Sequence, residues 1–209
     1  ANRYQTTLTN CRIRETLAEL VLADGHFEEG DGRLPALVRV DQSIMSVVLA
    51  EALSNARKYC DPGSPIVLRA SLSLSTDEGA AIGCREEHEL SIEIESANRA
   101  DVAALSDEEC SRVFKAGYRS RNALMTSDGL GLASVMQAVT AANGRTWLST
   151  RTQPAGVRTV FHVVMPVELV DESCCEVDLQ PTCTAAGRVP DASTDDSGAQ
   201  MGEGVDTLA

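Results

Sequence analysis

Hydrophobic residues recur at helical spacing in several segments of the chain, and this pattern predicts helices there. The predicted helices cover residues 12–22, 41–59, 106–114 and 132–142. Asp41 or Ser43 has a side chain suited to cap the second helix, and Ser106 suits the start of the third. The pair Asn143-Gly144 suits the end of the fourth helix, because Gly tolerates the left-handed backbone that closes a helix.

Alternation of apolar and polar residues predicts strands between these helices. The predicted strands cover residues 36–40, 66–74, 89–95, 145–152 and 157–165, and residues 153–156 join the last two in a hairpin. Residues 24–35, with three glycines, are predicted to be a polar loop. Strands joined by hairpins, or by helices that must all cover the same face, predict an α+β fold. We expect a two-layer α/β sandwich whose mixed, mostly antiparallel sheet is covered on one face by helices.

Composition divides the chain into three parts. Residues 1–35 are predicted as a helix and polar loop that lead into a domain, residues 36–166 as the domain, and residues 167–209 as an acidic disordered tail or linker. The last part has ten acidic residues, one basic residue (Arg188) and little aliphatic periodicity, which is typical of disordered segments. Because the chain does not begin with Met, we expect it to be a piece of a longer protein.

The charge of the chain excludes some classes of partner. The formal net charge is −13, whereas a protein that neutralises nucleic-acid phosphates needs a basic surface, so we expect no nucleic-acid partner. No apolar run approaches the roughly 18 residues of a spanning helix, so we expect no direct membrane insertion. Hydrophobic residues make up 43% of the chain and aromatic residues 3%, which predicts an aliphatic core.

Three polar residues of the second predicted helix share one stripe. Glu51, Asn55 and Lys58 are four and three residues apart, so they lie on the same side of a helix. Such a row is most often a solvated face. The alternative is a metal–phosphate site, because Mg²⁺ takes oxygen ligands such as the Asn55 carboxamide and keeps several waters. Lys58 would then contact phosphate, and Glu51 would orient water or accept a proton.

Two later stretches also suit phosphate. The sequence Gly129-Leu130-Gly131 opens the fourth predicted helix, where backbone N–H groups and the helix dipole favour an anion. Many turns of this kind are merely tight connections. Residues 113–121 are basic and contain Gly, so they form either an ordinary surface loop or a mobile lid that contacts phosphate.

In this order, the three stretches resemble the ATP-binding catalytic domain of sensor histidine kinases. This domain belongs to the superfamily of type II topoisomerases, mismatch-repair ATPases and heat-shock chaperones, which share the Bergerat fold. Residues 51–59 resemble the Asn box, residues 114–118 the Phe box and residues 129–133 the second glycine box. The resemblance covers residues 37–166. It also implies a cytoplasmic domain, whether or not the parent protein is anchored in a membrane.

The resemblance implies roles for the residues of the Asn box. Asn55 would hold Mg²⁺ against the triphosphate of ATP. Glu51 would take the position that is the general base in ATP-hydrolysing relatives. Lys58 would contact phosphate, and Tyr59 would pack beside the nucleotide.

The resemblance also implies roles for the second glycine box and for the segment before it. The backbone of Gly129, Leu130, Gly131 and Leu132 would wrap the phosphates. The segment from Arg119 to Thr126 would be the ATP lid, with Arg119 among the nucleotide contacts.

The chain departs from the family at the first glycine box. The family has an Asp there that accepts a hydrogen bond from adenine, followed by glycines. In this chain Ser96 replaces the Asp in the simplest register, and both glycines are absent. Asn98 would instead offer its carbonyl oxygen, or Ser96 would act through water. A buried adenine amine without an acceptor costs about 1–3 kcal/mol, so we expect ATP binding to be weakened, altered or lost.

The activity implied by the resemblance is transfer of the ATP γ-phosphoryl group to a histidine. That histidine would lie on a separate dimerisation domain of the parent kinase, in two-component or phosphorelay signalling, with a receiver domain or response regulator as a further partner. None of His26, His88 and His162 lies on a long helical pair, so we expect no autophosphorylation of this piece alone.

Two alternatives remain open at the level of the sequence. The altered first glycine box favours a degenerate nucleotide-binding-fold module that regulates or binds other proteins without kinase activity. The other alternative is an ATPase clamp that uses Glu51 to activate water.

Overall fold

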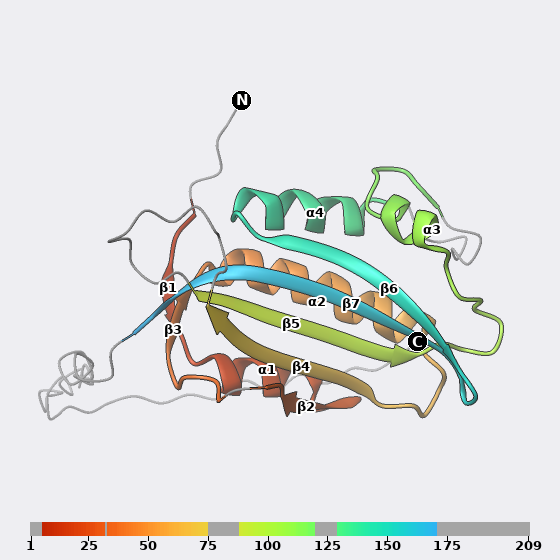
Figure 1. The fold of residues 1–209 in the computed structure, drawn as a ribbon, viewed down its shortest axis with the longest axis horizontal. Helices are drawn as coiled ribbons and strands as arrows, with labels where there is room; N and C mark the ends of the chain where they lie inside the picture. Colours follow the sequence, from red (N-terminus) through yellow and green to blue (C-terminus); the bar gives the residue numbers. More distant parts are fainter. Residues whose placement is uncertain (1–5, 32, 75–87, 120–128, 171–209) are drawn as a thin grey trace, which may run out of the picture. The chain divides into compact units, whose positions relative to one another are not determined.

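The computed structural model describes residues 6–31, 33–74, 88–119 and 129–170. The chain divides into two units, Ala1–Cys174 and Cys175–Ala209, and the second unit lies outside the described residues. The first unit holds every described helix and strand (Figure 1).

The described strands form one mixed seven-stranded sheet. They are β1 (Thr9–Cys11), β2 (Gly25–Glu29), β3 (Val38–Val40), β4 (Ile66–Leu74), β5 (His88–Ala97), β6 (Arg145–Gln153) and β7 (Gly156–Leu169). Strand β7 pairs with β5 along one edge and with β6 and then β3 along the other. The pair of β2 and β4 is parallel, and the other described pairs are antiparallel. The predicted mixed, mostly antiparallel sheet is therefore confirmed.

Four described helices pack on this sheet and on one another. They are α1 (Ile13–Val21), α2 (Gln42–Tyr59), α3 (Asp107–Arg112) and α4 (Gly131–Ala141). Helix α1 packs against β2 and β4, α2 against β5 and α4, and α4 against β6. Figure 1 shows α2 behind the ribbons of β5 and β7, on one face of the sheet. Among the described residues, no helix combines the length and the apolar character needed to cross a membrane.

The alternating pattern of β5 separates the two faces of the sheet. Leu90, Ile92 and Ile94 are buried in the core beneath the helices. Glu93 and Glu95 lie between them in sequence and are only partly buried, because successive side chains of a strand point to opposite faces. The predicted two-layer arrangement, in which the described helices cover one face of the sheet, is confirmed.

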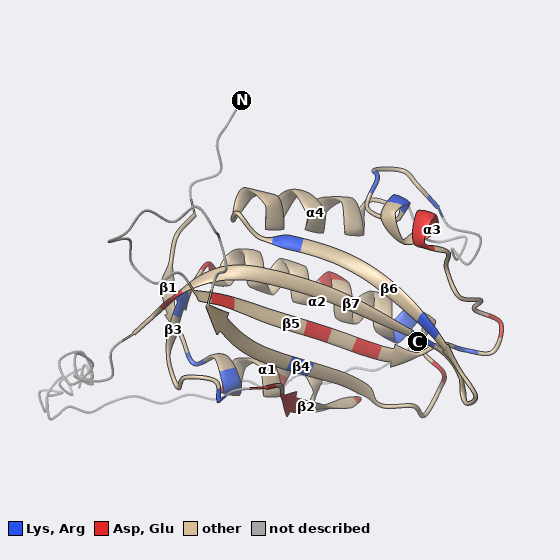
Figure 2. Ribbon diagram, in the orientation of Figure 1, with Lys and Arg blue, Asp and Glu red and all other residues tan. Residues whose placement is uncertain are grey.

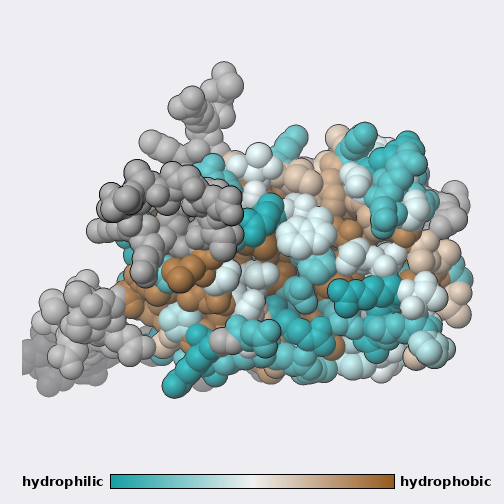
Figure 3. All heavy atoms as spheres, viewed as in Figure 1, coloured by the Kyte–Doolittle hydropathy of each residue, from teal (hydrophilic) through white to brown (hydrophobic). Residues whose placement is uncertain are grey.

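The face of the sheet away from the helices carries a network of charges. The Glu95 carboxylate accepts hydrogen bonds from Arg69 at 2.6 Å and from Arg158 at 2.7 Å, and Arg69 also donates to Glu28. Burial alone would raise the pKa of Glu95, but these two arginines outweigh burial and lower it. Figure 2 shows acidic residues along β5, and Figure 3 shows that this face mixes hydrophilic and hydrophobic surface.

The structure corrects the prediction for the first 35 residues. Residues 25–29 form the edge strand β2 instead of a polar loop, and residues 9–11 add the short strand β1 next to β3. Position 25 of β2 requires glycine, because a Cβ there would overlap the carbonyl oxygen of Ile66 on β4. At the other end, β7 continues to Leu169, three residues beyond the predicted limit of the domain, because its last residues pair with β3.

Candidate functional site

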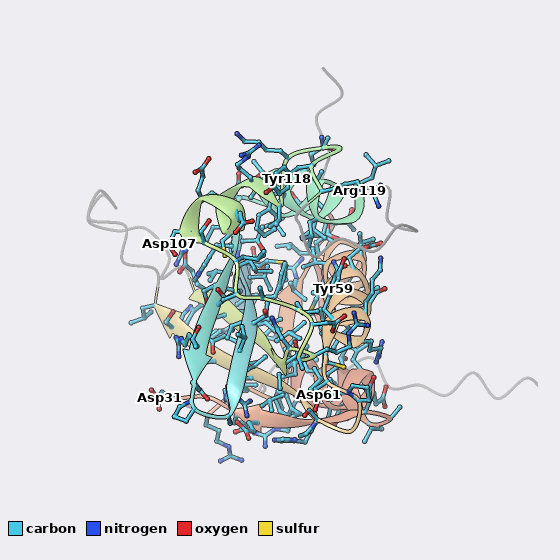
Figure 4. The ribbon with its side chains drawn as sticks, turned by 90° about the vertical axis from the view of Figure 1, so that its right-hand side faces the viewer. Asp31, Tyr59, Asp61, Asp107, Tyr118 and Arg119 are labelled. Atoms are coloured by element: carbon cyan, nitrogen blue, oxygen red, sulfur yellow. The ribbon has the colours of Figure 1, made fainter. Side chains whose placement is uncertain are left out.

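A cavity of about 460 Å³ opens between α2, the start of α4 and the helix-covered face of β5 and β7. All the candidate site residues line it: Glu51, Asn55, Lys58, Tyr59, Ser96, Asn98, Arg119, Gly129, Leu130, Gly131 and Leu132. In Figure 4, Tyr118 and Arg119 lie above Tyr59 on the side of the molecule that faces the viewer. Residues 120–128, which include most of the predicted lid, lie outside the described residues.

The polar row of α2 faces this cavity because apolar side chains occupy another face of the helix. The residues buried in the core are Ile44, Met45, Val48, Leu49, Ala52 and Leu53. The Asp41 side chain caps the helix by accepting a hydrogen bond from the backbone N–H of Ile44 at 3.0 Å. Within the described part of the chain, neither the Asn55 carboxamide nor the Glu51 carboxylate has a hydrogen-bond partner. Their oxygen atoms therefore remain available to a ligand.

The cationic groups of the site come from two elements. Lys58 lies in the last turn of α2, with its Nζ 5.8 Å from the centre of the Tyr59 ring. Arg119 reaches the cavity from the segment after α3. Since Glu51 is the only acidic residue among the described residues that line the cavity, the charge balance there favours an anionic ligand.

Helix α4 begins at the wall of the cavity. It starts at Gly131, and the residue before it, Leu130, has no side chain that can cap the helix. The first N–H groups of a helix have no partner within the helix, and they carry partial positive charge. The start of α4, where Leu130 provides no side-chain cap, is therefore suited to bind an anion.

The two glycines before and at the start of α4 are needed for different reasons. Gly129 has a φ of +71°, and a Cβ there would lie 2.7 Å from the carbonyl oxygen of Tyr118. A Cβ on Gly131 would overlap Oε2 of Glu51. The first glycine therefore permits a left-handed turn, whereas the second leaves room for the Glu51 carboxylate beside the start of α4.

The strands contribute a different set of groups. Ser96 of β5 lies opposite Thr159 of β7, and the next inward pair is Ile94 and Phe161. The hydroxyl of Thr159 donates a hydrogen bond of 2.8 Å to Oδ1 of Asn98. Sequence reasoning missed Thr159, although the alternation of β7 places it on the same face as the buried Phe161.

Backbone hydrogen bonds attach the end of α2 to the loop after β5. The N–H of Arg99 donates to the carbonyl of Tyr59 at 3.0 Å, and the N–H of Asp61 donates to the carbonyl of Ala97 at 2.8 Å. These bonds fix Tyr59 near Asn98, so that residues from α2 and β5 keep their places around the cavity. Tyr118 was also missed as a lining residue, and the guanidinium of Arg112 lies 4.8 Å from its ring centre.

Comparison with known proteins identifies the family. The sequence profile of histidine kinase-, DNA gyrase B-, and HSP90-like ATPases matches residues 40–169. The chain belongs to this ATPase family. The match extends from the end of β3 to the end of β7 and includes every candidate site residue. No curated protein sequence matches the chain.

Solved structures share the fold of this ATPase-family chain. A mycobacterial sensor histidine kinase, MprB, is 23% identical with a TM-score of 0.55, over 78% of this chain and 100% of that one. The nucleotide-free catalytic domain of the histidine kinase ThkA is 16% identical with a TM-score of 0.57, over 77% of this chain and 95% of that one. Full-length ShkA in complex with AMPPNP is 18% identical with a TM-score of 0.55, over 81% of this chain. The aligned part spans 33% of the ShkA chain.

Proposed function

We propose that the chain is the ATP-binding catalytic domain of a histidine kinase in two-component or phosphorelay signalling. The observation that carries the proposal is that the polar row of α2 and the N-terminal end of α4 line the same cavity. Membership of the ATPase family supports the binding of ATP, and the shared fold of histidine kinase catalytic domains supports the kinase assignment.

The donor set of the cavity fits a magnesium ion. Mg²⁺ prefers oxygen ligands and retains several waters, so it needs only one or two protein oxygens besides those of the phosphates. The carboxamide oxygen of Asn55 would be such a ligand, and no described residue forms a hydrogen bond with it. The ion would supply charge neutralisation for the triphosphate, and Asn55 would hold it.

The residues of this chain would act mainly by placing charge around the phosphates. Lys58 and Arg119 supply cations, and the N–H groups at the start of α4 supply hydrogen-bond donors. Transfer breaks the bond between the γ-phosphorus and the oxygen of the leaving ADP, and it forms a bond to an imidazole nitrogen of the acceptor histidine. Catalysis of such a transfer depends on positioning and on electrostatic stabilisation. Glu51 would orient the incoming nucleophile.

Titration of the chain with Mg-ATP tests the proposal. We expect measurable binding that disappears when EDTA removes Mg²⁺, and an Asn55→Ala variant that binds at least about tenfold more weakly. Asn10→Ala, at an exposed position of β1 outside the cavity, is the matched control and should bind like the wild type. Absence of binding at millimolar nucleotide would contradict the proposal.

One observation favours the second candidate, a regulatory or protein-interaction module without kinase activity. The strand-lined part of the cavity offers Ser96, Asn98 and Thr159 but no carboxylate among the described residues. Failure to bind nucleotide would support this module. Hydrolysis of ATP without any acceptor hairpin, abolished by Glu51→Ala, would instead support an ATPase clamp.

A further inference from the structure

The part of the cavity lined by β5 and β7 has an unusual set of polar groups for a base pocket. Its described residues include Ser96, Asn98 and Thr159 beside the apolar Ile94 and Phe161, and none of them is charged. Apolar walls with a few fixed hydrogen-bonding groups suit a planar heterocycle. The cations and the start of α4 would hold the phosphates, so the base would lie against these strands.

The hydrogen bond from Thr159 decides what Asn98 can offer to a base. A carboxamide has one carbonyl oxygen that accepts and one NH₂ group that donates. The Thr159 hydroxyl already donates to Oδ1 of Asn98 at 2.8 Å. The NH₂ group has no hydrogen-bond partner among the described residues. The hydroxyl of Thr159 thus occupies one of the two lone pairs of Oδ1 and holds the amide in place, so that Asn98 offers its NH₂ donors to the cavity.

Ser96 adds a hydroxyl that can both donate and accept a hydrogen bond. Ser96 is a buried residue with a relative exposure of 4%, and its hydroxyl forms no hydrogen bond to another described residue. A hydroxyl both donates and accepts, so it can adapt to either kind of base edge. The strand-lined part of the cavity thus offers the NH₂ donors of Asn98 and an adaptable hydroxyl, and its described residues include no carboxylate.

These hydrogen-bonding groups matter because adenine differs from guanine and hypoxanthine in the groups at C6 and N1. Adenine has an amine that donates at C6 and a nitrogen that accepts at N1. Guanine and hypoxanthine have a carbonyl that accepts at C6 and an N–H that donates at N1. A carboxylate would accept from the amine of adenine and would repel a carbonyl. The Asn98 NH₂ can donate to a C6 carbonyl, while the Ser96 hydroxyl can accept from N1–H.

We propose that this nucleotide site does not select adenine, and that it binds purine triphosphates with a carbonyl at C6 about as well as ATP. The proposal rests on the proposed function, since it specifies the base of the nucleotide bound in the same cavity. Asn98 is the residue that sets this tolerance, and Thr159 positions its amide.

Paired titrations with Mg-ATP and Mg-ITP test the proposal, because hypoxanthine and adenine differ only at this edge. We expect the dissociation constants of the wild-type chain to lie within about fivefold of each other. In Asn98→Asp the Thr159 hydroxyl keeps an acceptor, but the new carboxylate has no donor for a C6 carbonyl. The preference for ATP should therefore increase by at least about fivefold. Asn10→Asp adds the same charge on β1 outside the cavity and should leave the ratio unchanged.

A second, uncharged variant covers the case in which Asn98→Asp does not fold, as judged by circular dichroism. Thr159→Val removes the donor that occupies Oδ1, so the amide can turn its carbonyl to the base and the ratio should shift towards ATP. A wild-type preference for ATP above about fivefold, or a ratio that the folded variant does not change, would overturn this inference while leaving ATP binding intact. Failure of both nucleotides to bind would instead overturn the proposed function, and this inference with it.

Discussion

Gly131 shows how a single hydrogen atom in place of a side chain can serve the site. A Cβ at this position would overlap Oε2 of Glu51, which is the far end of a flexible side chain. In Gly131→Ala we expect Glu51 to move while the fold remains, because alanine favours the helix more than glycine does. The free energy of unfolding should change by less than about 1 kcal/mol, whereas any activity that depends on Glu51 should fall. Urea unfolding and phosphotransfer assays measure the two effects separately.

Gly129→Ala is the contrasting variant, because there the added methyl group meets backbone. Its φ of +71° is unfavourable for alanine, and the nearest atom to the new Cβ is the Tyr118 carbonyl oxygen at 2.7 Å. We expect a loss of about 1–3 kcal/mol of unfolding free energy. Equal stability losses in the two variants would contradict the distinction between them.

At the scale of elements, α3 depends on its capping box. The Ser106 hydroxyl accepts from the N–H of Glu109, and the Glu109 carboxylate accepts from the N–H of Ser106 at 2.9 Å. Because α3 has only six residues, the cap satisfies a large part of its backbone groups. Ser106→Ala should therefore lower the free energy of unfolding by about 1 kcal/mol, measured by urea denaturation.

Ser111 provides the matched control within the same helix. Its hydroxyl donates to the carbonyl of Asp107 one turn earlier, a bond that duplicates what the helix backbone already provides. Ser111→Ala should leave stability unchanged or raise it slightly, because alanine is the better helix former. A larger loss from Ser111→Ala than from Ser106→Ala would contradict the role of the cap.

Strands β5 and β2 show which strands a sequence pattern can predict and which it cannot. Strand β5 has a strict alternation, so Leu90, Ile92 and Ile94 identified it and its buried face. None of the side chains of β2 is fully buried, and its pattern does not alternate. It is a strand because its backbone pairs in parallel with β4, and because Glu28 bonds to Arg69. Such pairing depends on a partner about 40 residues away, which local periodicity cannot reveal.

At the scale of the whole molecule, His162 links stability to pH. Its ring stacks on Trp147 with 4.6 Å between centres, and its Nδ1 lies 3.2 Å from the Glu93 carboxylate. Burial lowers the pKa of His162 below its usual value near 6.5; Glu93 opposes this shift and Arg151 adds to it. As the pH falls through 6.5, the unfolded chain therefore takes up a proton before the folded chain does. We expect the free energy of unfolding to be steady above this pH and to decrease below it.

Denaturation of the wild type and His162→Gln at several pH values checks this expectation. The variant should lose the decrease that begins near pH 6.5, since position 162 no longer carries an imidazole that can take up a proton. A second decrease should begin below about pH 4.5 in both proteins, because the pKa of Glu95 is lowered and its ion pairs weaken as it takes up a proton. A variant with the same slope as the wild type near pH 6 would contradict the role of His162.

The sequence by itself determined the elements that carry their own pattern and caps. These include α2 with its polar row, the hairpin of β6 and β7, and α4 with the glycines at its start. They could be predicted because helix and strand periodicity, capping and turn preferences act between residues close in the chain.

Only the tertiary structure decided which distant groups meet. It placed Glu51 against Gly131, paired the Thr159 hydroxyl with Asn98 and brought β2 to the edge of the sheet. These contacts arise from burial of the aliphatic core between the helices and one face of the sheet, which fixes α2, α4, β5 and β7 relative to one another. Since packing sets the distance between side chains on separate elements, no pattern within one element could have specified them.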